Sequence, residues 1–333
     1  MGRAVHGEGA RIVFRPPDLT FFVTARTDVP HVLRLDSGRP GPRVGLVALV
    51  HGNEPAGARA LGRLLELGVR PVRGALVLIL AHPEAAARGV RFLERDLNRV
   101  WDRLDEPADG PELRRARRLR PLLAELDVVL DLHTSRVATP PFLLTGPTDK
   151  AAALARVLAT PPIVVRDHGH AAGRRLIDWG PFADPARPET ALLLEAGRHD
   201  DPASVDAALS CILALLRHLA MLDAETASWL PPPRPRPVSV LEVTRTVTVD
   251  RGPFVFARGI RHFALLPAAG TLVARDGPRP VRTPHDDCVV ILPAHRPRPG
   301  RTAMRLARLV EGPLPAATEV TVTPAQTKGR SAR

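Results

Sequence analysis

Short apolar runs alternate with longer amphipathic stretches over the first two thirds of the chain. The short runs have the length of strands, and Gly or Pro bounds several of them, which is typical of strands buried on both faces. Strands are therefore expected at 44–50, 75–81, 127–133, 163–165 and 190–194. The amphipathic stretches predict helices at 56–67, 112–126, 150–158 and 204–222. This alternation predicts an α/β fold with a mostly parallel, mixed sheet flanked by helices.

The hydrophobic pattern changes after a proline-rich segment at 231–237, which predicts a stiff extended linker. Residues 1–230 form the first predicted domain. Residues 238–315 hold short β-type runs separated by Gly and Pro, and they predict a small β-rich C-terminal module. The polar residues 316–333 predict a disordered tail. The β-type runs of the module lie at 238–249, 254–257, 270–274 and 288–292, and two more strands are expected at 21–24 and 31–35.

Composition narrows the functional classes. The net charge is +12, but Lys150 and Lys328 are the only lysines, so 45 of the 47 basic residues are arginines, and these are spread along the chain. Aromatic residues are few and no nucleic-acid-reading motif is present, so we expect no nucleic-acid partner. No apolar stretch approaches about 18 residues and no signal peptide is evident, so no membrane partner is expected. Two cysteines, Cys211 and Cys288, fit a reducing, cytoplasmic location.

The turn between the strand at 44–50 and the following helix carries candidate metal chemistry. Its sequence is His51-Gly52-Asn53-Glu54-Pro55, in which Gly52 permits a sharp turn and Pro55 suits the first turn of a helix. Because His51 and Glu54 are three residues apart, a tight turn can direct an imidazole nitrogen and a carboxylate oxygen to one divalent metal. An ordinary structural turn is the alternative.

Two further candidates, His133 and Glu195, stand at the ends of predicted strands. Ligands gather at the carboxyl ends of the strands in open α/β sheets, so His51, His133 and Glu195 are expected to converge. Asp131 lies two residues before His133 and shares its sheet face, where its carboxylate could fix the tautomer of a metal-bound imidazole. The alternative is an Asp-x-His-Thr turn with ordinary hydrogen bonds.

Residues 91–101, Arg-Phe-Leu-Glu-Arg-Asp-Leu-Asn-Arg-Val-Trp, form a second polar cluster. Its arginines and Asn98 could hold a carboxylate, since a guanidinium pairs with a carboxylate through two hydrogen bonds and an amide adds a directional donor. The alternative is a surface loop whose Asp and Arg pair with each other. The basic run at 114–118 is expected to be the solvated face of a helix.

Four motifs, in this order and spacing, resemble the succinylglutamate desuccinylase/aspartoacylase family. They are His51-Gly-Asn-Glu54, Asp96-Leu-Asn98-Arg99, Asp131-Leu-His133-Thr and Glu195-Ala-Gly. The resemblance covers roughly residues 44–225 and is weaker in the β-rich region. Because that family belongs with the zinc carboxypeptidases, the resemblance implies a zinc-carboxypeptidase-like fold and a zinc-dependent hydrolase domain over residues 1–230.

The resemblance also implies a catalytic centre. His51, Glu54 and His133 would be the ligands of one Zn²⁺ per chain, and Glu195 would activate the water bound to it. Three protein ligands leave the fourth zinc position open to water, which is typical of a catalytic rather than a structural site. Zinc lowers the pKa of that water to about 7, and Glu195 could pass its proton to the departing amine.

Substrate contacts follow from the same resemblance. Arg91 would polarise the scissile carbonyl and stabilise its oxyanion, while Asn98 and Arg99 would hold a carboxylate of the substrate. Family members often carry a tyrosine near the C-terminus that reaches the active site, but this chain has no tyrosine. A loose alignment puts Arg305 in its place. Arg305 either enters the pocket and favours a second acidic group on the substrate, or lies on a solvated helix face.

Our favoured hypothesis is a zinc-dependent amidohydrolase: a deacylase of a small N-acylated amino acid or similar carboxylate-bearing amide. A carboxypeptidase-type metallopeptidase, with the same metal and base but another pocket, is the nearest alternative. A non-catalytic zinc-binding scaffold with a basic partner-binding surface belongs to a different class. The expected partner is a small anionic amide substrate. The acyl group, the amine, homo-oligomerisation and the role of the β-rich module stay open.

Overall fold

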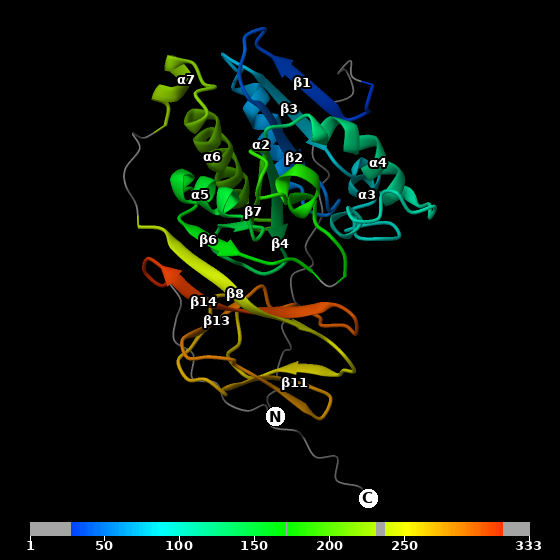
Figure 1. Cartoon of the computed structure of the whole chain (residues 1–333), viewed down its shortest axis with the longest axis vertical. Coiled ribbons are helices and arrows are strands. Elements are labelled where there is room, and N and C mark those ends of the chain that lie inside the picture. The colour runs from blue at the N-terminus through cyan, green and yellow to red at the C-terminus, as the bar shows by residue number, and fades with distance from the viewer. Residues whose placement is uncertain (1–27, 171, 231–236, 316–333) are drawn as a thin grey trace, which may run out of the picture.

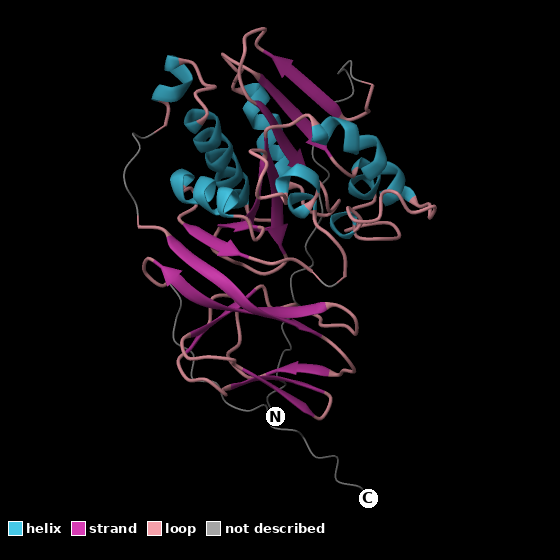
Figure 2. Ribbon diagram, in the orientation of Figure 1, coloured by secondary structure: helices cyan, strands magenta, loops and turns pink. Residues whose placement is uncertain are grey.

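The computed structural model describes residues 28–170, 172–230 and 237–315 (Figures 1 and 2). The strand expected at 21–24, the proline-rich segment apart from its last residue and the tail at 316–333 lie outside the described residues. The strands before residue 231 are β1 (Val32–Asp36), β2 (Arg43–Ala48), β3 (Ala75–Leu80), β4 (Val128–Ser135), β5 (Phe142–Thr145), β6 (Ile163–Arg166) and β7 (Thr190–Arg198). The strands after residue 236 are β8 (Ser239–Thr248), β9 (Phe254–Phe256), β10 (Leu265–Leu266), β11 (Leu272–Asp276), β12 (Arg279–Arg282), β13 (Cys288–Ile291) and β14 (Thr302–Glu311).

Helices connect the early strands. The α-helices are α2 (Ala56–Glu66), α3 (Pro83–Ala87), α4 (Pro111–Ala124), α5 (Asp149–Leu158), α6 (Pro202–His218) and α7 (Ala224–Ser228), and the 3₁₀ helices are η1 (Leu97–Arg99), η2 (Leu176–Asp178) and η3 (Gly180–Phe182). In the described part of the chain, no helix is both long enough and apolar enough to cross a membrane.

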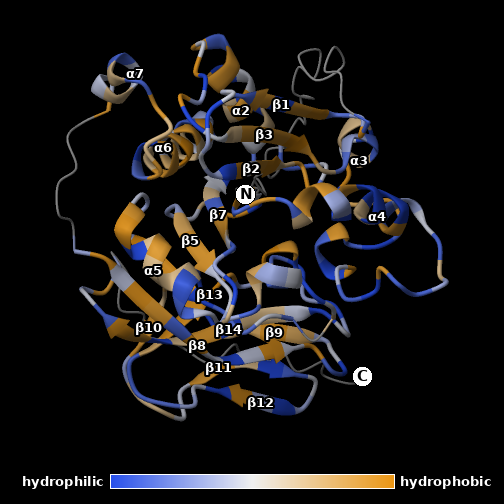
Figure 3. Cartoon of the chain, turned by 45° about the horizontal axis from the view of Figure 1, so that its top comes forward, coloured by the Kyte–Doolittle hydropathy of each residue, from blue (hydrophilic) through white to orange (hydrophobic). Residues whose placement is uncertain are grey.

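The centre of the large sheet is parallel and buried. Within the described residues this sheet has the order β1-β3-β2-β4-β7-β5-β6-β8-β14-β13-β10, and β2 pairs in parallel with β3 and β4, as β4 does with β7. Residues of α2, α5 and α6 share one apolar core with one face of these strands, and α4 shares another core with the opposite face. Covering both faces explains the nearly continuous apolar runs, which Figure 3 shows as orange central strands.

The predicted α/β fold with a mostly parallel, mixed sheet is confirmed. Each strand and helix expected between residues 44 and 222 is present, with small shifts at its ends, and α4 continues through Pro121. The short strand β5 was not predicted, because three apolar residues and a threonine are too few to show a period. The stretch around Arg305 is strand β14, so its placement on a helix face is wrong.

The C-terminal strands continue the same sheet. β8 pairs in parallel with β6, and β14, β13 and β10 follow it in antiparallel order. A three-stranded sheet, β12-β11-β9, packs against them around a third apolar core. Figure 1 shows these yellow-to-red strands below the helix-flanked strands. The strand-rich C-terminal region is thus present, and it brings β14 near the carboxyl ends of β4 and β7.

Candidate metal centre and active site

The turn after β2 is held tightly against its neighbours. The backbone N–H of Glu54 donates to the carbonyl of His51 (3.1 Å), and that of Gly52 donates to the carbonyl of Arg91 (3.1 Å). A Cβ at Gly52 would lie 2.2 Å from the carbonyl carbon of Ala85 in α3, so only glycine allows this close approach. These two backbone hydrogen bonds and the close approach at Gly52 therefore determine the direction in which the side chains of His51 and Glu54 point.

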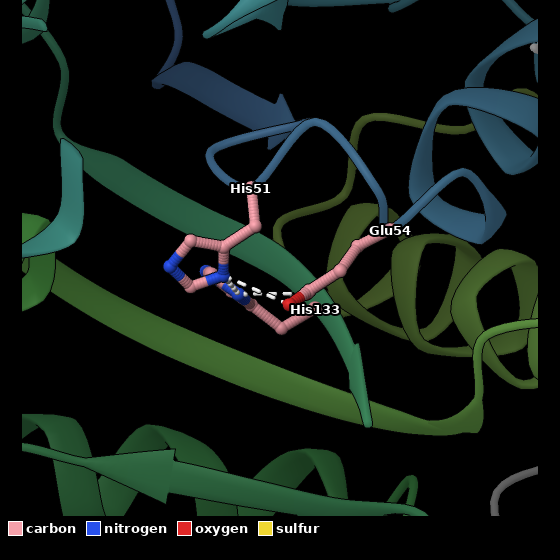
Figure 4. A group of neighbouring side chains, drawn as sticks. All are labelled: His51, Glu54 and His133. Carbon is pink, nitrogen blue, oxygen red and sulfur yellow. Dashed lines mark hydrogen bonds and ion pairs between the residues drawn. The ribbon is translucent and has the colours of Figure 1, made fainter. Parts of the chain in front are cut away.

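His51, Glu54 and His133 form a buried cluster of potential metal ligands (Figure 4). Nδ1 of His51 lies 2.9 Å from Oε1 of Glu54, and Nδ1 of His133 lies 3.0 Å from Oε2 of Glu54. The two Nδ1 atoms are 3.1 Å apart. The first two residues come from the turn after β2 and the third from β4, so adjacent parallel strands bring them together.

This donor set fits a divalent metal such as zinc. Bonds of about 2.0–2.2 Å would put the ligand atoms of a tetrahedral zinc site roughly 3.4 Å apart, a few tenths of an ångström more than the separations between these atoms. Two imidazoles and one carboxylate are a common catalytic set that leaves one position open. His51, Glu54 and His133 could therefore hold one ion.

Carboxylates face the outer nitrogen of each imidazole. Oδ1 of Asp96 lies 3.0 Å from Nε2 of His51, and Oδ2 of Asp131 lies 2.9 Å from Nε2 of His133, the latter at ion-pair distance but outside hydrogen-bond geometry. Such partners favour the Nε2–H tautomer and leave the Nδ1 lone pair for a metal. Burial alone would lower the pKa of His133, but Asp131 and Glu54 raise it well above its usual value.

Glu195 and Arg91 border the three potential ligands. Oε2 of Glu195 is buried and has no hydrogen-bond partner in the described part of the chain. Burial first, and the charge of Glu54 second, raise the pKa of Glu195 to about 8, while His133 and Arg91 oppose this shift. Arg91 donates to Oε1 of Glu54 (3.3 Å) and to Oδ2 of Asp96 (3.1 Å). A carboxylate and a guanidinium thus flank the cluster.

Asn98 and Arg99, in η1, line the same cavity as Glu195 and Arg91. Both side chains have N–H groups that could donate hydrogen bonds to a ligand. Oδ1 of Asn98 accepts the N–H of Leu176 (2.8 Å), so only the amide NH₂ group remains for a ligand. Arg99 donates to the carbonyl of Asn98 (2.5 Å) and contacts Nε2 of His170 (2.8 Å), and both acceptors are neutral. Burial first, together with Arg91 and Arg305, lowers the pKa of Arg99 to about 10 despite the opposing effect of Asp96. Among the described residues, Arg99 has no carboxylate within ion-pair distance.

Arg305 belongs to the cavity wall. It is 4% exposed, its Nε donates to Oδ2 of Asp167 (2.6 Å), and its guanidinium also contacts His170. Asp167 accepts a second hydrogen bond from the buried Arg175 (2.9 Å). The C-terminal strands therefore share an ion-pair network with the segment after β6.

One cavity of about 570 Å³ connects all of these groups. Its size suits a small ligand. Among the residues that the structure describes, its lining includes three carboxylate residues, Glu54, Asp96 and Glu195. Its arginines are Arg91, Arg99, Arg136, Arg175, Arg296, Arg298, Arg301 and Arg305. This excess of positive charge favours an anionic ligand.

The structure brings together every residue that the sequence nominated, and it adds others. His170 and Asp167 come from the segment Asp-His-Gly-His after β6, and His199 follows β7. The rule that chemistry gathers at the carboxyl ends of parallel strands could have identified His199, because it follows β7, which is parallel to β4. The rule does not cover Asp167 and His170, because β6 is parallel to β5, and β5 is antiparallel to β7. Nothing in the spacing of the loop at 292–301 indicated that it lines the cavity.

Comparison with known sequences identifies relatives of this region. Residues 40–174 match the model of the succinylglutamate desuccinylase/aspartoacylase catalytic domain. A succinylglutamate desuccinylase from Vibrio cholerae is 38% identical over 89 residues, which are 26% of this chain and 25% of the relative. One from Pseudomonas paraeruginosa is 39% identical over 100 residues, covering 27% of this chain and 30% of the relative. The match thus spans about a quarter of the length of these curated relatives.

Solved structures extend the likeness in fold to most of the chain. A crystal structure of succinylglutamate desuccinylase from Vibrio cholerae superposes with a TM-score of 0.67 at 20% identity, covering 84% of this chain and 85% of the other. A succinylglutamate desuccinylase/aspartoacylase from Rhodobacter sphaeroides gives a TM-score of 0.59 at 20% identity, with 82% and 86% covered. At this identity the likeness establishes the architecture, including the C-terminal strands.

Proposed function

We propose that this chain belongs to the succinylglutamate desuccinylase/aspartoacylase family and is a zinc-dependent hydrolase that removes the acyl group from a small, carboxylate-bearing N-acylated amino acid. The observation that carries this proposal is the buried cluster of His51, Glu54 and His133, in which a carboxylate faces the outer nitrogen of each imidazole. The carboxylate of Glu195, whose Oε2 has no hydrogen-bond partner among the described residues, borders the same cavity.

Zinc held by His51, Glu54 and His133 would supply a Lewis acid and lower the pKa of a bound water. Glu195 then has a defined task. Its carboxylate accepts the proton of the attacking water and returns it to the amine nitrogen as the C–N bond breaks, so the products are a carboxylate and a free amine. The pKa of about 8 that burial gives Glu195 would be lowered by a divalent cation. Glu195 is thereby suited to exchange protons near neutral pH.

Arg91 would stabilise the charge that develops on the scissile carbonyl oxygen. Its guanidinium is tethered between Glu54 and Asp96 and lines the cavity, so it is positioned before substrate arrives. Donors placed in advance contribute about 10²–10³ in rate at comparable sites. The charge pairs with Glu54 and Asp96 also keep Arg91 from reorienting.

Arg99 and Asn98 would bind a free carboxylate of the substrate. Arg99 is a largely buried cation whose hydrogen bonds go to neutral acceptors, and Asn98 still has its NH₂ group to offer. A buried guanidinium without an anion is costly, and a substrate carboxylate removes that cost. This pair therefore supports an acidic substrate over a neutral amide.

A carboxypeptidase-type peptidase is the second candidate, because it would also need a metal, a base and a carboxylate site. Metal analysis of the purified protein, together with a panel of N-acyl amino acids and N-blocked dipeptides, separates the candidates. We expect one zinc per chain and faster turnover of the N-acyl amino acids. Faster turnover of dipeptides would favour the peptidase, and bound metal without hydrolysis of either class would favour a non-catalytic scaffold.

A further inference from the structure

A buried carboxylate outside the cavity organises the loop that approaches the metal ligands. Glu112 lies in the first turn of α4 and is fully buried. Its Oε1 accepts the N–H of Leu93 (2.7 Å) and lies 2.9 Å from Nε2 of His82, and its Oε2 accepts the N–H of Arg95 (3.2 Å). The N–H of Glu94 makes a longer contact with Oε1 (3.3 Å). These partners all lie outside α4, so Glu112 does more than stabilise its own helix.

The segment that Glu112 holds is attached to the metal centre at both ends. Arg91 precedes the held amides and donates to Glu54, while Asp96 follows them and faces His51. The carbonyl of Arg91 also accepts the N–H of Gly52 inside the metal-binding turn. Two side chains and one backbone group of this loop therefore contact the turn that carries His51 and Glu54.

His82 provides a second attachment on the other side of that turn. Its side chain is buried against Glu112, and its backbone N–H donates to the carbonyl of Leu49 (2.9 Å), two residues before His51. Leu49 has a positive φ of 58°, an uncommon conformation for a branched side chain, so it depends on its surroundings. Glu112 thus links α4, the N-cap residue of α3 (His82) and the loop at 91–96 around one turn.

We infer that Glu112 is a positioning residue for the active site: its carboxylate fixes the loop at 91–96, so that Arg91 and Asp96 orient Glu54 and His51. The inference rests on the proposed function, because it assigns to Glu112 an effect on metal affinity and turnover. Burial opposes ionisation of Glu112, but His82 and the amides of Leu93 and Arg95 outweigh burial and lower its pKa. The ionised carboxylate, which only accepts hydrogen bonds, matches this ring of donors.

The test is Glu112→Gln, which keeps the shape but replaces one acceptor oxygen by an NH₂ group facing N–H donors. We expect the amides of Leu93 and Arg95 to exchange hydrogen faster, and zinc measured with a competing chelator to bind about tenfold more weakly, since partners beyond the ligands commonly contribute 10–100-fold. Turnover should fall more than KM rises. In the double variant with Asp96→Asn, the losses in zinc affinity should be less than additive, because both act on one loop.

Asp109→Asn is the matched control. It removes an exposed carboxylate three residues away that pairs with Arg114 at the same end of α4, and it should leave zinc affinity and turnover unchanged. If Glu112→Gln fails to fold, Glu112→Asp keeps the charge but shortens the reach, and it should show the same changes to a smaller degree. A folded Glu112 variant with wild-type zinc affinity and wild-type amide exchange would overturn the inference about Glu112 but not the proposed function. A wild-type protein that binds no zinc would instead overturn the proposed function.

Discussion

The two sides of the cavity differ in origin and in charge balance. The metal side comes from β2, β4 and β7, and its histidines face carboxylates from Glu54, Asp96 and Asp131. The opposite wall comes from the segment after β6, from β14 and from the loop at 292–301, and it is rich in arginine. On the metal side, the two histidines and Arg91 are paired with carboxylates before any ligand binds. The arginine wall, in contrast, leaves positive charge to be matched.

We infer from this difference that the metal side carries out the reaction and that the arginine wall selects the substrate. A paired and buried centre holds its geometry without substrate, as hydrolysis requires. A wall with surplus guanidinium groups gains most from a substrate that brings negative charge. Changes on the metal side should therefore affect all substrates alike, and changes in the wall should depend on the charge of the substrate.

The largest effect should come from removing a metal ligand. His133→Ala should lose most of its zinc and, with it, more activity than the roughly 10²–10⁴ that a general base contributes. Elemental analysis and turnover of each substrate measure this effect. His168→Ala, which removes an exposed imidazole paired with Glu242, is the control and should keep its metal. Wild-type metal content in His133→Ala would remove the site assignment.

Glu195→Gln should keep the metal and lose turnover by about 10²–10⁴, because Gln cannot accept the proton. The pH profile provides a second measurement. A base works only when deprotonated, so wild-type kcat should fall as pH is lowered through the pKa of Glu195. That pKa is about 8 from burial and Glu54, and bound metal should move it lower. Near-full activity in the variant would contradict the assigned role of Glu195.

These two predictions concern the side of the cavity that the sequence describes well. His51, Glu54 and His133 belong to short motifs at strand ends, where local spacing and the parallel sheet together determine their positions. The sheet itself was predictable, because buried strands have apolar runs and helices have their own period.

The residues of the arginine wall were harder to predict from the sequence. Asp167 and Arg305 are 138 residues apart and meet only because β8 and β14 extend the sheet beyond β6. The apolar residues around Arg305 fit either a helix or a strand, and pairing with β8 and β13 decides the outcome. The role of Glu112 was equally hard to predict, because most of its partners are backbone N–H groups, which carry no sequence signal.

Arg99 lies in η1 and contacts His170 of the arginine wall, so it tests the positive charge between that wall and the metal side. Arg99→Gln should lower kcat/KM for a carboxylate substrate by about 10–100-fold, equivalent to about 1.5–3 kcal/mol for a charged hydrogen bond. Methyl esterification of that carboxylate should cause a similar loss in the wild type and little further loss in the variant. Equal rates for acid and ester in the wild type would show that Arg99 does not bind the carboxylate.

The smallest effect should come from Arg305, because its Nε already pairs with Asp167 and only part of its charge is available to a substrate. Arg305→Ala should weaken kcat/KM for a dicarboxylate substrate by about tenfold, near 1.5 kcal/mol, and leave a monocarboxylate substrate nearly unchanged. Asp167 keeps Arg175 as a partner in this variant, so no buried carboxylate is left unpaired. Arg308→Ala, which changes an exposed arginine on the same strand, should alter neither substrate. A loss shared equally by both substrates would assign Arg305 to the framework of the cavity, and the separation of chemistry from selectivity would then fail at this residue.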